Sequence, residues 1–526
     1  MRGGLFLHTM SALGSTALLT AVSLFSQVVG FLYRVALSRM VGAEVMGLYQ
    51  LVMPVGSVLL SLTAVGFTVA CSHLSARDQA VGGKAQCART VRACVIGFLT
   101  AFVLVAAVAA PLSDAISVRF LGDARSRLGI LLLLPWVLLT GLENIHKHFF
   151  YGSGNVRPPA FTEICEQLIR AGAVLGLLWH FLPQSPERTV GLIVCGMIVC
   201  EVFSAVTLTL LYRRAIGSPP PVRLEEGRAS RKTLRRRVLS IALPIGATAL
   251  LSNLMGAWTA VLVPQRLVRS GSDVSAAMSA FGVMCGMTLP LLSLPTAFIS
   301  AMGLVLLPKL SQAAALGRMD LCRRRADRAV TAAAWLILPA AALLAVLAQP
   351  LGRAMFHNPA VGQYALPLAL GVALSCFEAV TSVCLNGLGR QRINAAHGLV
   401  CGAVQLFLTW WRMSLPGVGL RGYVEALLVS TALGCVLNWH TLRNLTGMHI
   451  QWRRWLVGPG LSAALAGLDA NLLYPLLTRS GLGETAAALV CLGFGGVVYL
   501  CAMAAQGLFR RPRSVPRRRL DRGEKI

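Results

Sequence analysis

The chain alternates between long apolar runs and short polar segments. A helix that crosses a bilayer needs about 20 mainly apolar residues, and runs of this length recur along the whole sequence. The predicted spans are residues 11–33, 46–70, 91–111, 128–150, 162–182, 190–212, 238–263, 276–307, 328–348, 364–386, 394–414, 418–442, 455–476 and 485–508. The pattern predicts an all-α polytopic membrane protein with fourteen transmembrane helices. The first run has no small-residue cleavage site, so we expect it to remain as a helix.

Composition supports lipid as the solvent for most of this surface. Hydrophobic residues make up 56% of the 526 positions and charged residues 13%, whereas soluble domains carry about 25% charged residues. The mean hydropathy is +0.69. The 14 cysteines lie mostly inside apolar runs and lack metal-binding spacing with histidine. We therefore expect neither a metal site nor a disulfide framework.

The positive charge of the chain predicts its orientation. A net charge of +28 would suit nucleic acid in a soluble protein. Here Lys and Arg cluster in short segments between apolar runs, which is typical of the positive-inside rule. With a cytoplasmic N-terminus, about three quarters of these residues fall on the cytoplasmic side, and an even number of helices keeps the basic tail there too. We expect both termini in the cytoplasm, contacts with anionic membrane lipid, and no nucleic-acid partner.

Two short motifs indicate an internal repeat. Residues 152–157 and 387–392 share the pattern Gly-x-Gly-x-x-Arg at an offset of 235 residues, and residues 82–89 match 317–324 at the same offset. A dinucleotide-binding loop would need a preceding strand, so we interpret the glycines as tight turns between helices. Halves of six helices have the same orientation in the membrane, as in transporters whose halves rock about a central site.

The repeat divides the chain into five parts. We predict a first six-helix bundle over residues 1–212, a basic cytoplasmic linker over 213–237 and a second six-helix bundle over 238–442. Two additional transmembrane helices follow over residues 443–508, and a basic cytoplasmic tail covers 509–526. Pro290 and Pro295 lie inside the span at 276–307 and are expected to kink or break it. Such a break is either a fixed kink or a moving element.

Several segments resemble a known transporter family. Residues 30–44 (GFLYRVALSRMVGAE) with Gly-Leu-Tyr at 47–49, and residues 151–170, are similar to the stage V sporulation protein B-like flippases, an oligosaccharide/polysaccharide branch of the MATE-like (MOP) exporters. The resemblance runs from about residue 11 to 500. It implies two bundles around a central cavity, and transport of an undecaprenyl-pyrophosphate-linked sugar, either the peptidoglycan precursor lipid II or a polysaccharide unit. The related lipid II flippases carry arginine in the first helix where this chain has Gln27.

Charged and amide residues inside the spans are the candidates for substrate binding. A charge in a helix centre costs roughly 2.5–3.5 kcal/mol on insertion, so such groups face protein or water. Arginine suits a diphosphate because its planar fork binds oxygens in pairs. The substrate-binding candidates are Gln27, Arg34, Arg39, Glu166, Gln167 and Arg170. Structural alternatives remain open: Glu166 and Arg170, four residues apart, suit a self-neutralising ion pair, Arg34 suits snorkelling, and Arg39 with Glu44 suits an outer-loop contact.

Acidic residues within the spans are candidates for ion coupling. Glu143, Glu163 and Glu378 are the candidates for binding a coupling H⁺ or Na⁺, and Glu201 and Glu425 are further lone acids in or near spans. Each also suits a structural pairing across helices. No cofactor is expected, and the chain is expected to act as a monomer.

Three classes of function compete. A lipid-linked oligosaccharide flippase is favoured, because the spans at 238–263 and 276–307 contain no Asp or Glu. A cation-coupled multidrug (MATE-type) exporter is the alternative, and it would need acids there for its cationic cargo. A membrane glycosyltransferase or polymerase would need acidic or His clusters on outer loops, which are short here. We therefore predict that the protein is not an enzyme and has no catalytic residue.

Overall fold

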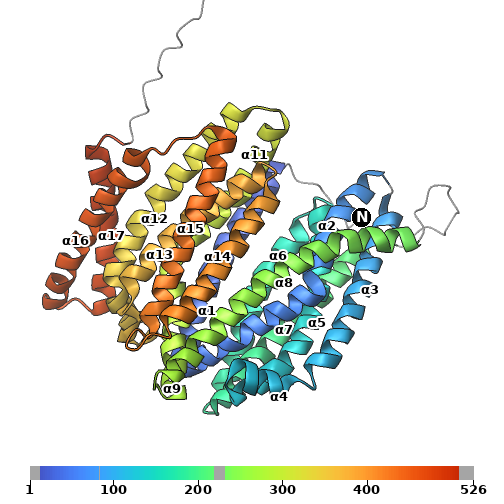
Figure 1. Ribbon diagram of the computed structural model, residues 1–526, viewed down its shortest axis with the longest axis horizontal. Helices are drawn as coiled ribbons and strands as arrows, with labels where there is room; N and C mark the ends of the chain where they lie inside the picture. Colours follow the sequence, from blue (N-terminus) through green and yellow to red (C-terminus); the bar gives the residue numbers. More distant parts are fainter. Residues whose placement is uncertain (1–11, 82, 218–230, 509–526) are drawn as a thin grey trace, which may run out of the picture.

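Helices account for every regular element of the computed structural model, which describes residues 12–81, 83–217 and 231–508 (Figure 1). No strand occurs within these ranges. The α-helices are α1 (Ala12–Leu60), α2 (Gly66–Val81), α3 (Gly83–Ala109), α4 (Ser113–Ala115), α5 (Arg127–Gly152), α6 (Arg157–Phe181), α7 (Pro186–Ile216), α8 (Arg231–Arg269), α9 (Val274–Phe281), α10 (Leu289–Leu292), α11 (Thr296–Ala315), α12 (Met319–Phe356), α13 (Ala365–Gly387), α14 (Gln391–Arg412), α15 (Leu420–Thr446), α16 (Gly458–Arg479) and α17 (Glu484–Ala505). Short π- or 3₁₀-helices are η1 (Ser61–Val65), η2 (Ile116–Leu121), η3 (Ala124–Ser126), η4 (Gly282–Thr288), η5 (Pro359–Gly362) and η6 (Arg453–Val457).

The helices confirm the predicted class of multi-pass membrane protein. Thirteen helical segments of the described chain are long and apolar enough to span a bilayer. The segment Ala17–Gln79 contains two of the predicted spans, and Val274–Leu292 with Thr296–Ala315 together form one. Helix α6, with 25 residues, covers the predicted span 162–182 but is not among the thirteen. The helices are therefore consistent with fourteen crossings.

Helix α1 bends sharply at Gly42. The backbone there has φ 77° and ψ 178°, a conformation open to glycine and disfavoured for residues with a Cβ. The first predicted helix therefore does not end near Arg34; it continues to this bend. The two limbs of α1 diverge from the end of the molecule where α9 lies (Figure 1). The charge rule predicts that this end faces outside.

The two halves of the chain lie side by side, with the last two helices at one edge (Figure 1). In the first half, α5, α6 and α7 pack on one another, and in the second half α13 packs on α15 and α12. Helix α8 contacts both α2 and α14. Helices α16 and α17 pack against α12. The predicted span at 276–307, in the second half, is broken. Its helix stops at Leu292 and restarts at Thr296, so the break expected at Pro290 and Pro295 is present.

The repeat is visible in equivalent backbone contacts. Gly154 and Gly389 both have positive φ, 75° and 76°, as the expected tight turns require. Cys87 donates to the Ser75 carbonyl at 3.6 Å, and Cys322 donates to the Leu310 carbonyl at 3.9 Å. Each residue in these pairs lies 235 positions from its partner in the other half. The two halves therefore share local structure as well as sequence.

A contact between repeat-related glycines closes the predicted outer end. A Cβ on Gly47 would lie 2.0 Å from the Met278 carbonyl oxygen, and one on Gly282 would lie 2.0 Å from the Ala43 carbonyl oxygen. Gly47 and Gly282, like Ala43 and Met278, are 235 residues apart. Glycine at both positions lets the helices touch backbone to backbone. We call this contact the outer seal.

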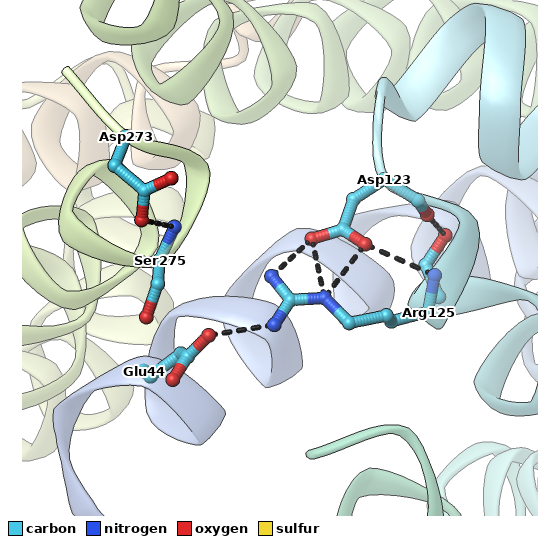
Figure 2. Close-up of polar contacts among 6 residues, drawn as sticks. Glu44, Asp123, Arg125, Asp273 and Ser275 are labelled. Carbon is cyan, nitrogen blue, oxygen red and sulfur yellow. Dashed lines mark hydrogen bonds and ion pairs between the residues drawn. The ribbon is translucent and has the colours of Figure 1, made fainter. Parts of the chain in front are cut away.

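Charged side chains surround the outer seal. Figure 2 shows Arg125 of η3 holding Asp123, with its Nη2 2.7 Å from Asp123 Oδ2, and reaching Glu44 of α1 at 2.6 Å. On the second half, Asp273 caps α9 by accepting from the Ser275 amide at 3.0 Å. Arg39 donates to the carbonyls of Ala354 and Met355 at the C-terminal end of α12. A cation at that position also suits the helix dipole, so Arg39 joins the halves.

Some predicted segments fall partly outside the described residues. The basic tail at 509–526 and the central part of the linker, 218–230, lie outside them. The ends of the predicted linker are helical, since α7 runs to Ile216 and α8 begins at Arg231. The division into two bundles at residues 212 and 238 stays a prediction.

Candidate functional site

Five ionisable side chains meet inside the first half. Glu143 and Lys147 come from α5, Glu166 and Arg170 from α6, and Glu201 from α7. Each pair on one helix is four residues apart and therefore shares a face. The three helices pack together and turn these faces toward one another. We call these five residues the charge network.

The charge network is continuous. Lys147 Nζ lies 2.8 Å from Glu143 Oε1 and 3.7 Å from Glu166 Oε2. Arg170 Nη2 donates to Glu166 and lies 3.6 Å from Glu201 Oε1. The Glu143 and Glu201 side chains are each 3% exposed. Three buried atoms of this set make no hydrogen bond in the described part of the chain: Glu143 Oε1 (which lies in the ion pair with Lys147), Arg170 Nε and Glu201 Oε2.

Burial makes the balance of charge in the network important. Each isolated ion costs several kcal/mol to bury, and the cost is recovered only by close opposite charges. The network has three acids against two bases, so with every group ionised it carries a formal charge of −1. The two bases are well used, because each contacts two carboxylates. The acids are therefore left one positive charge short.

The network bears on two alternatives that the sequence left open. Glu143 and Glu201 both take part in ion pairs, the structural role that the sequence allowed for each acid, and their role in ion coupling stays a prediction. The pair of Glu166 and Arg170 is present, but it is a part of a larger set and is not self-contained. Periodicity identifies the faces of α5, α6 and α7 but cannot show that these faces meet. Lys147 was missed as a site residue for the same reason.

The other sequence candidates lie apart from the network. Gln27 and Arg34 are exposed on the first limb of α1, seven residues apart and so on one face. Arg34 has no ion-pair partner among the described residues. Gln167 and Glu163 are half-buried on α6.

Two further candidates contact backbone in the second half. The carboxyl group of Glu378 on α13 lies close to Gly434 of α15, where an added Cβ would be 2.4 Å from Oε1. Glu378 is 235 residues after Glu143, so it is the repeat counterpart of that acid. Arg39 lies at the outer seal and holds α12.

A central cavity lies between the halves, next to the outer seal. Its volume is about 420 Å³. The lining comes from α1, α8, α9, η4, α14 and α15. The residues that line it are Gln50, Pro54, Ser252, Met255, Gly256, Thr259, Ala260, Phe281, Cys285, Gly398, Gly402, Gln405 and Tyr423. No Asp, Glu, Lys, Arg or His is among these described residues.

The chemistry of the cavity is that of neutral hydrogen bonding. The side-chain amides of Gln50 and Gln405 have no hydrogen-bond partner in the described ranges, and each offers two donors and an acceptor. The Ser252 and Tyr423 hydroxyls add to this set. Sugar hydroxyls, which both donate and accept, match such groups. Sequence reasoning missed these residues, although the repeat offers a signal: Gln405 lies 235 positions after Arg170.

Comparisons with known proteins agree with this architecture. Residues 12–314 match the family described as "Polysaccharide biosynthesis protein". Stage V sporulation protein B of Bacillus subtilis (strain 168) is 22% identical over 447 residues, covering 84% of this chain and 86% of that protein.

Solved structures show the same fold at low identity. The lipid II flippase MurJ in an inward closed conformation superimposes with a TM-score of 0.66 and 11% identity, covering 93% of this chain and 98% of that one. An inward-facing multidrug resistance MATE family transporter of the MOP superfamily gives a TM-score of 0.59 and 18% identity, covering 82% of this chain and 100% of that one.

Proposed function

The chain belongs to the polysaccharide biosynthesis protein family, and from that premise we propose that it is a flippase. Its cargo is an undecaprenyl-pyrophosphate-linked oligosaccharide, either lipid II or a polysaccharide unit. The protein carries the polar head across the cytoplasmic membrane by alternating access of its two halves. The relatives named as a sporulation protein and a lipid II flippase support this cargo class. Both termini lie in the cytoplasm in this proposal.

The observation that carries the proposal is the neutral lining of the central cavity. A polar sugar head that entered hydrocarbon would lose its hydrogen bonds to water, at several kcal/mol per uncompensated group. Gln50, Gln405 and Tyr423 can replace those bonds between the halves. A cationic drug would instead need an acid in the cavity, and the described lining contains none. The same observation therefore disfavours the multidrug exporter.

The diphosphate of the cargo needs a separate contact, and we propose Arg34 with Gln27. Both side chains are exposed on one face of α1, and Arg34 has no carboxylate partner in the described ranges. The guanidinium keeps its charge and binds phosphate oxygens in pairs. The prenyl tail stays in lipid. In this proposal Glu166 and Arg170 belong to the charge network, and Gln167 lies beside it on α6. Arg39 acts at the outer seal.

Alternating access follows from the closed outer seal. Contact of Gly47 with Gly282, together with the hydrogen bonds of Arg39 of α1 to carbonyls of α12, closes the outer end in this conformation. Transport then needs a second state in which these contacts separate. An ion that binds the two states differently can drive the change, and Glu143, Glu163 and Glu378 are the candidates for binding H⁺ or Na⁺.

The experiment replaces the cavity amides and measures transport. Purified full-length protein is reconstituted in vesicles with a fluorescent undecaprenyl-pyrophosphate-linked sugar, and an impermeant reductant reports its arrival at the opposite leaflet. Gln50→Leu and Gln405→Leu should each slow transport about 5–150-fold, because an unmet sugar hydroxyl costs about 1–3 kcal/mol. Gln312→Leu, an exposed position on α11, is the matched control. Unchanged transport in both cavity variants would contradict the proposed site.

A further inference from the structure

We propose that the charge network binds one proton, shared between Glu143 and Glu201. The two side chains come from helices α5 and α7, which pack against each other, and both are almost fully buried within interaction range of one another. Glu201 Oε2 makes no hydrogen bond within the described chain, and neither does the Thr140 hydroxyl beside it. A proton on the pair removes the unbalanced negative charge of the network. Two buried carboxyl groups this close cannot both ionise cheaply, so they share a proton.

The groups facing this pair come from every helix packed around it. They are Thr140 and Lys147 of α5, Glu166 and Arg170 of α6, and Cys200 of α7. Tyr33 and Tyr49 of α1 lie near Arg170 and Cys200, whereas the exposed Arg34 lies near these tyrosines and makes no ion pair among the described residues. Lys147 and Arg170 are both engaged with carboxylates, and Tyr49 donates toward the Met197 sulfur at 3.7 Å. Neither tyrosine brings a positive charge. The counter-ion that the third acid requires must therefore be bound from outside the network.

A metal cation is the competing ligand, and the geometry disfavours it. Ligand atoms of Glu166, Cys200 and Glu201 lie within 4.8 Å of one another. The guanidinium of Arg170 already contacts the two carboxylates of this group, and it would repel a cation placed among them. A thiol is also a poor ligand for a hard ion such as Na⁺. A proton meets none of these objections, because it needs only the proximity of Glu143 and Glu201.

The repeat shows that the network is particular to the first half. The counterpart of Glu143 is Glu378, but Lys147, Glu166, Arg170 and Glu201 correspond to Ser382, Cys401, Gln405 and Val436 at the same offset. The second half therefore has one acid where the first has three acids and two bases. A structural role common to both halves would not need the extra charges. The proton bound here would be the ion that drives the proposed transport, and in that respect the inference rests on the flippase proposal.

The test detects the proton without any cargo. Infrared difference spectroscopy of full-length protein in nanodiscs, at near-neutral pH, detects the C=O stretch of a protonated carboxyl group, because exposed acids with pKa values of about 4 are ionised there. Wild-type protein should show one such band from the network. Glu143→Gln and Glu201→Gln should each abolish it, since two acids then balance two bases. Glu187→Gln, at the outer start of the same helix as Glu201, is the matched control and should keep it.

A charge-removing variant tests the same balance in the opposite direction. Lys147→Met leaves three acids against one base, so the band should double in intensity. This second variant keeps the test decisive if a glutamine variant fails to fold. A band that persists in both glutamine variants would overturn the assignment, as would its absence from wild-type protein. Loss of the band when K⁺ is replaced by Na⁺ would identify sodium instead and overturn the proton. The infrared test uses no cargo, so its outcome does not depend on whether the transport assay of the proposed function succeeds.

Discussion

Replacing Gly47 with alanine tests whether the outer seal controls access to the cavity. The new Cβ would lie 2.0 Å from the Met278 carbonyl oxygen and 3.2 Å from the Gly282 nitrogen. Real Cβ atoms almost never approach closer than 3.0 Å to another heavy atom, so α1 and the α9–η4 segment must separate by about 1 Å. The obstacle is backbone on both sides, and no flexible side chain can move away.

The magnitude follows from the cost of overpacking. Inserting a methyl group into a tightly packed contact costs about 1–3 kcal/mol. If the closed state alone contains this contact, the whole cost falls on that state and the equilibrium shifts about 5–150-fold toward the open state. Gly282→Ala meets the Ala43 carbonyl at the same distance and should have the same effect. The double variant should shift the equilibrium by less than the sum, because both changes relieve one contact.

The assay uses a cysteine that the chain already contains. Cys285 lines the cavity just beyond the seal. A membrane-impermeant thiol reagent added on the outer side should label Cys285 faster in Gly47→Ala than in wild-type protein, and a Cys285→Ala background identifies its share of the signal. Gly30→Ala in the same helix is the matched control, since nothing lies within 4 Å of its new Cβ. Equal labelling of Gly47→Ala and Gly30→Ala would refute the seal.

Three further substitutions test other contacts. Arg39→Met removes two hydrogen bonds to the C-terminal carbonyls of α12 and should destabilise the closed state by about 1–2 kcal/mol. Labelling of Cys285 from the outer side should therefore become faster. Unchanged labelling would show that Arg39 does not hold the outer seal closed. Lys147→Met removes a base buried among carboxylates and should destabilise the fold by less than the roughly 3–5 kcal/mol of an uncompensated buried charge, because a second proton offsets the lost base; the melting temperature should still fall below that of the exposed control Lys309→Met. Glu425→Gln breaks a pair with Arg412 whose side chains are 45% and 32% exposed, so it should cost under about 1 kcal/mol and leave the melting temperature nearly unchanged; a large fall would show that this pair is structural.

The transmembrane pattern and the repeat could be predicted because each depends on the order of residues along the chain and not on which helices meet in space. A span needs a run of apolar residues, and a broken span needs Pro290 and Pro295 inside it. The offset that links Gly154 to Gly389 also survives in the contacts of the folded chain. The sequence predicted two separate helices where the structure has one helix with a sharp bend at Gly42. A glycine in sequence marks a turn between helices and a bend within a helix equally, so the two cases could not be told apart.

The charge network and the cavity could not be predicted in the same way. Helical spacing places Glu166 and Arg170 on one face, but the meeting of that face with Glu143 and Glu201 depends on tertiary packing. Gln50 and Gln405 are ordinary polar residues in sequence, and they become a pair only where α1 and α14 line one cavity. Neither charge nor period marks a neutral site.

Direct measurement of the cargo class tests the central claim. Vesicles containing the purified wild-type chain are loaded in parallel with a fluorescent undecaprenyl-pyrophosphate-linked sugar and with a cationic dye, and movement of each across the bilayer is followed. The neutral cavity predicts that the lipid-linked sugar moves and the dye does not. Export of the dye without movement of the lipid-linked sugar would contradict the account.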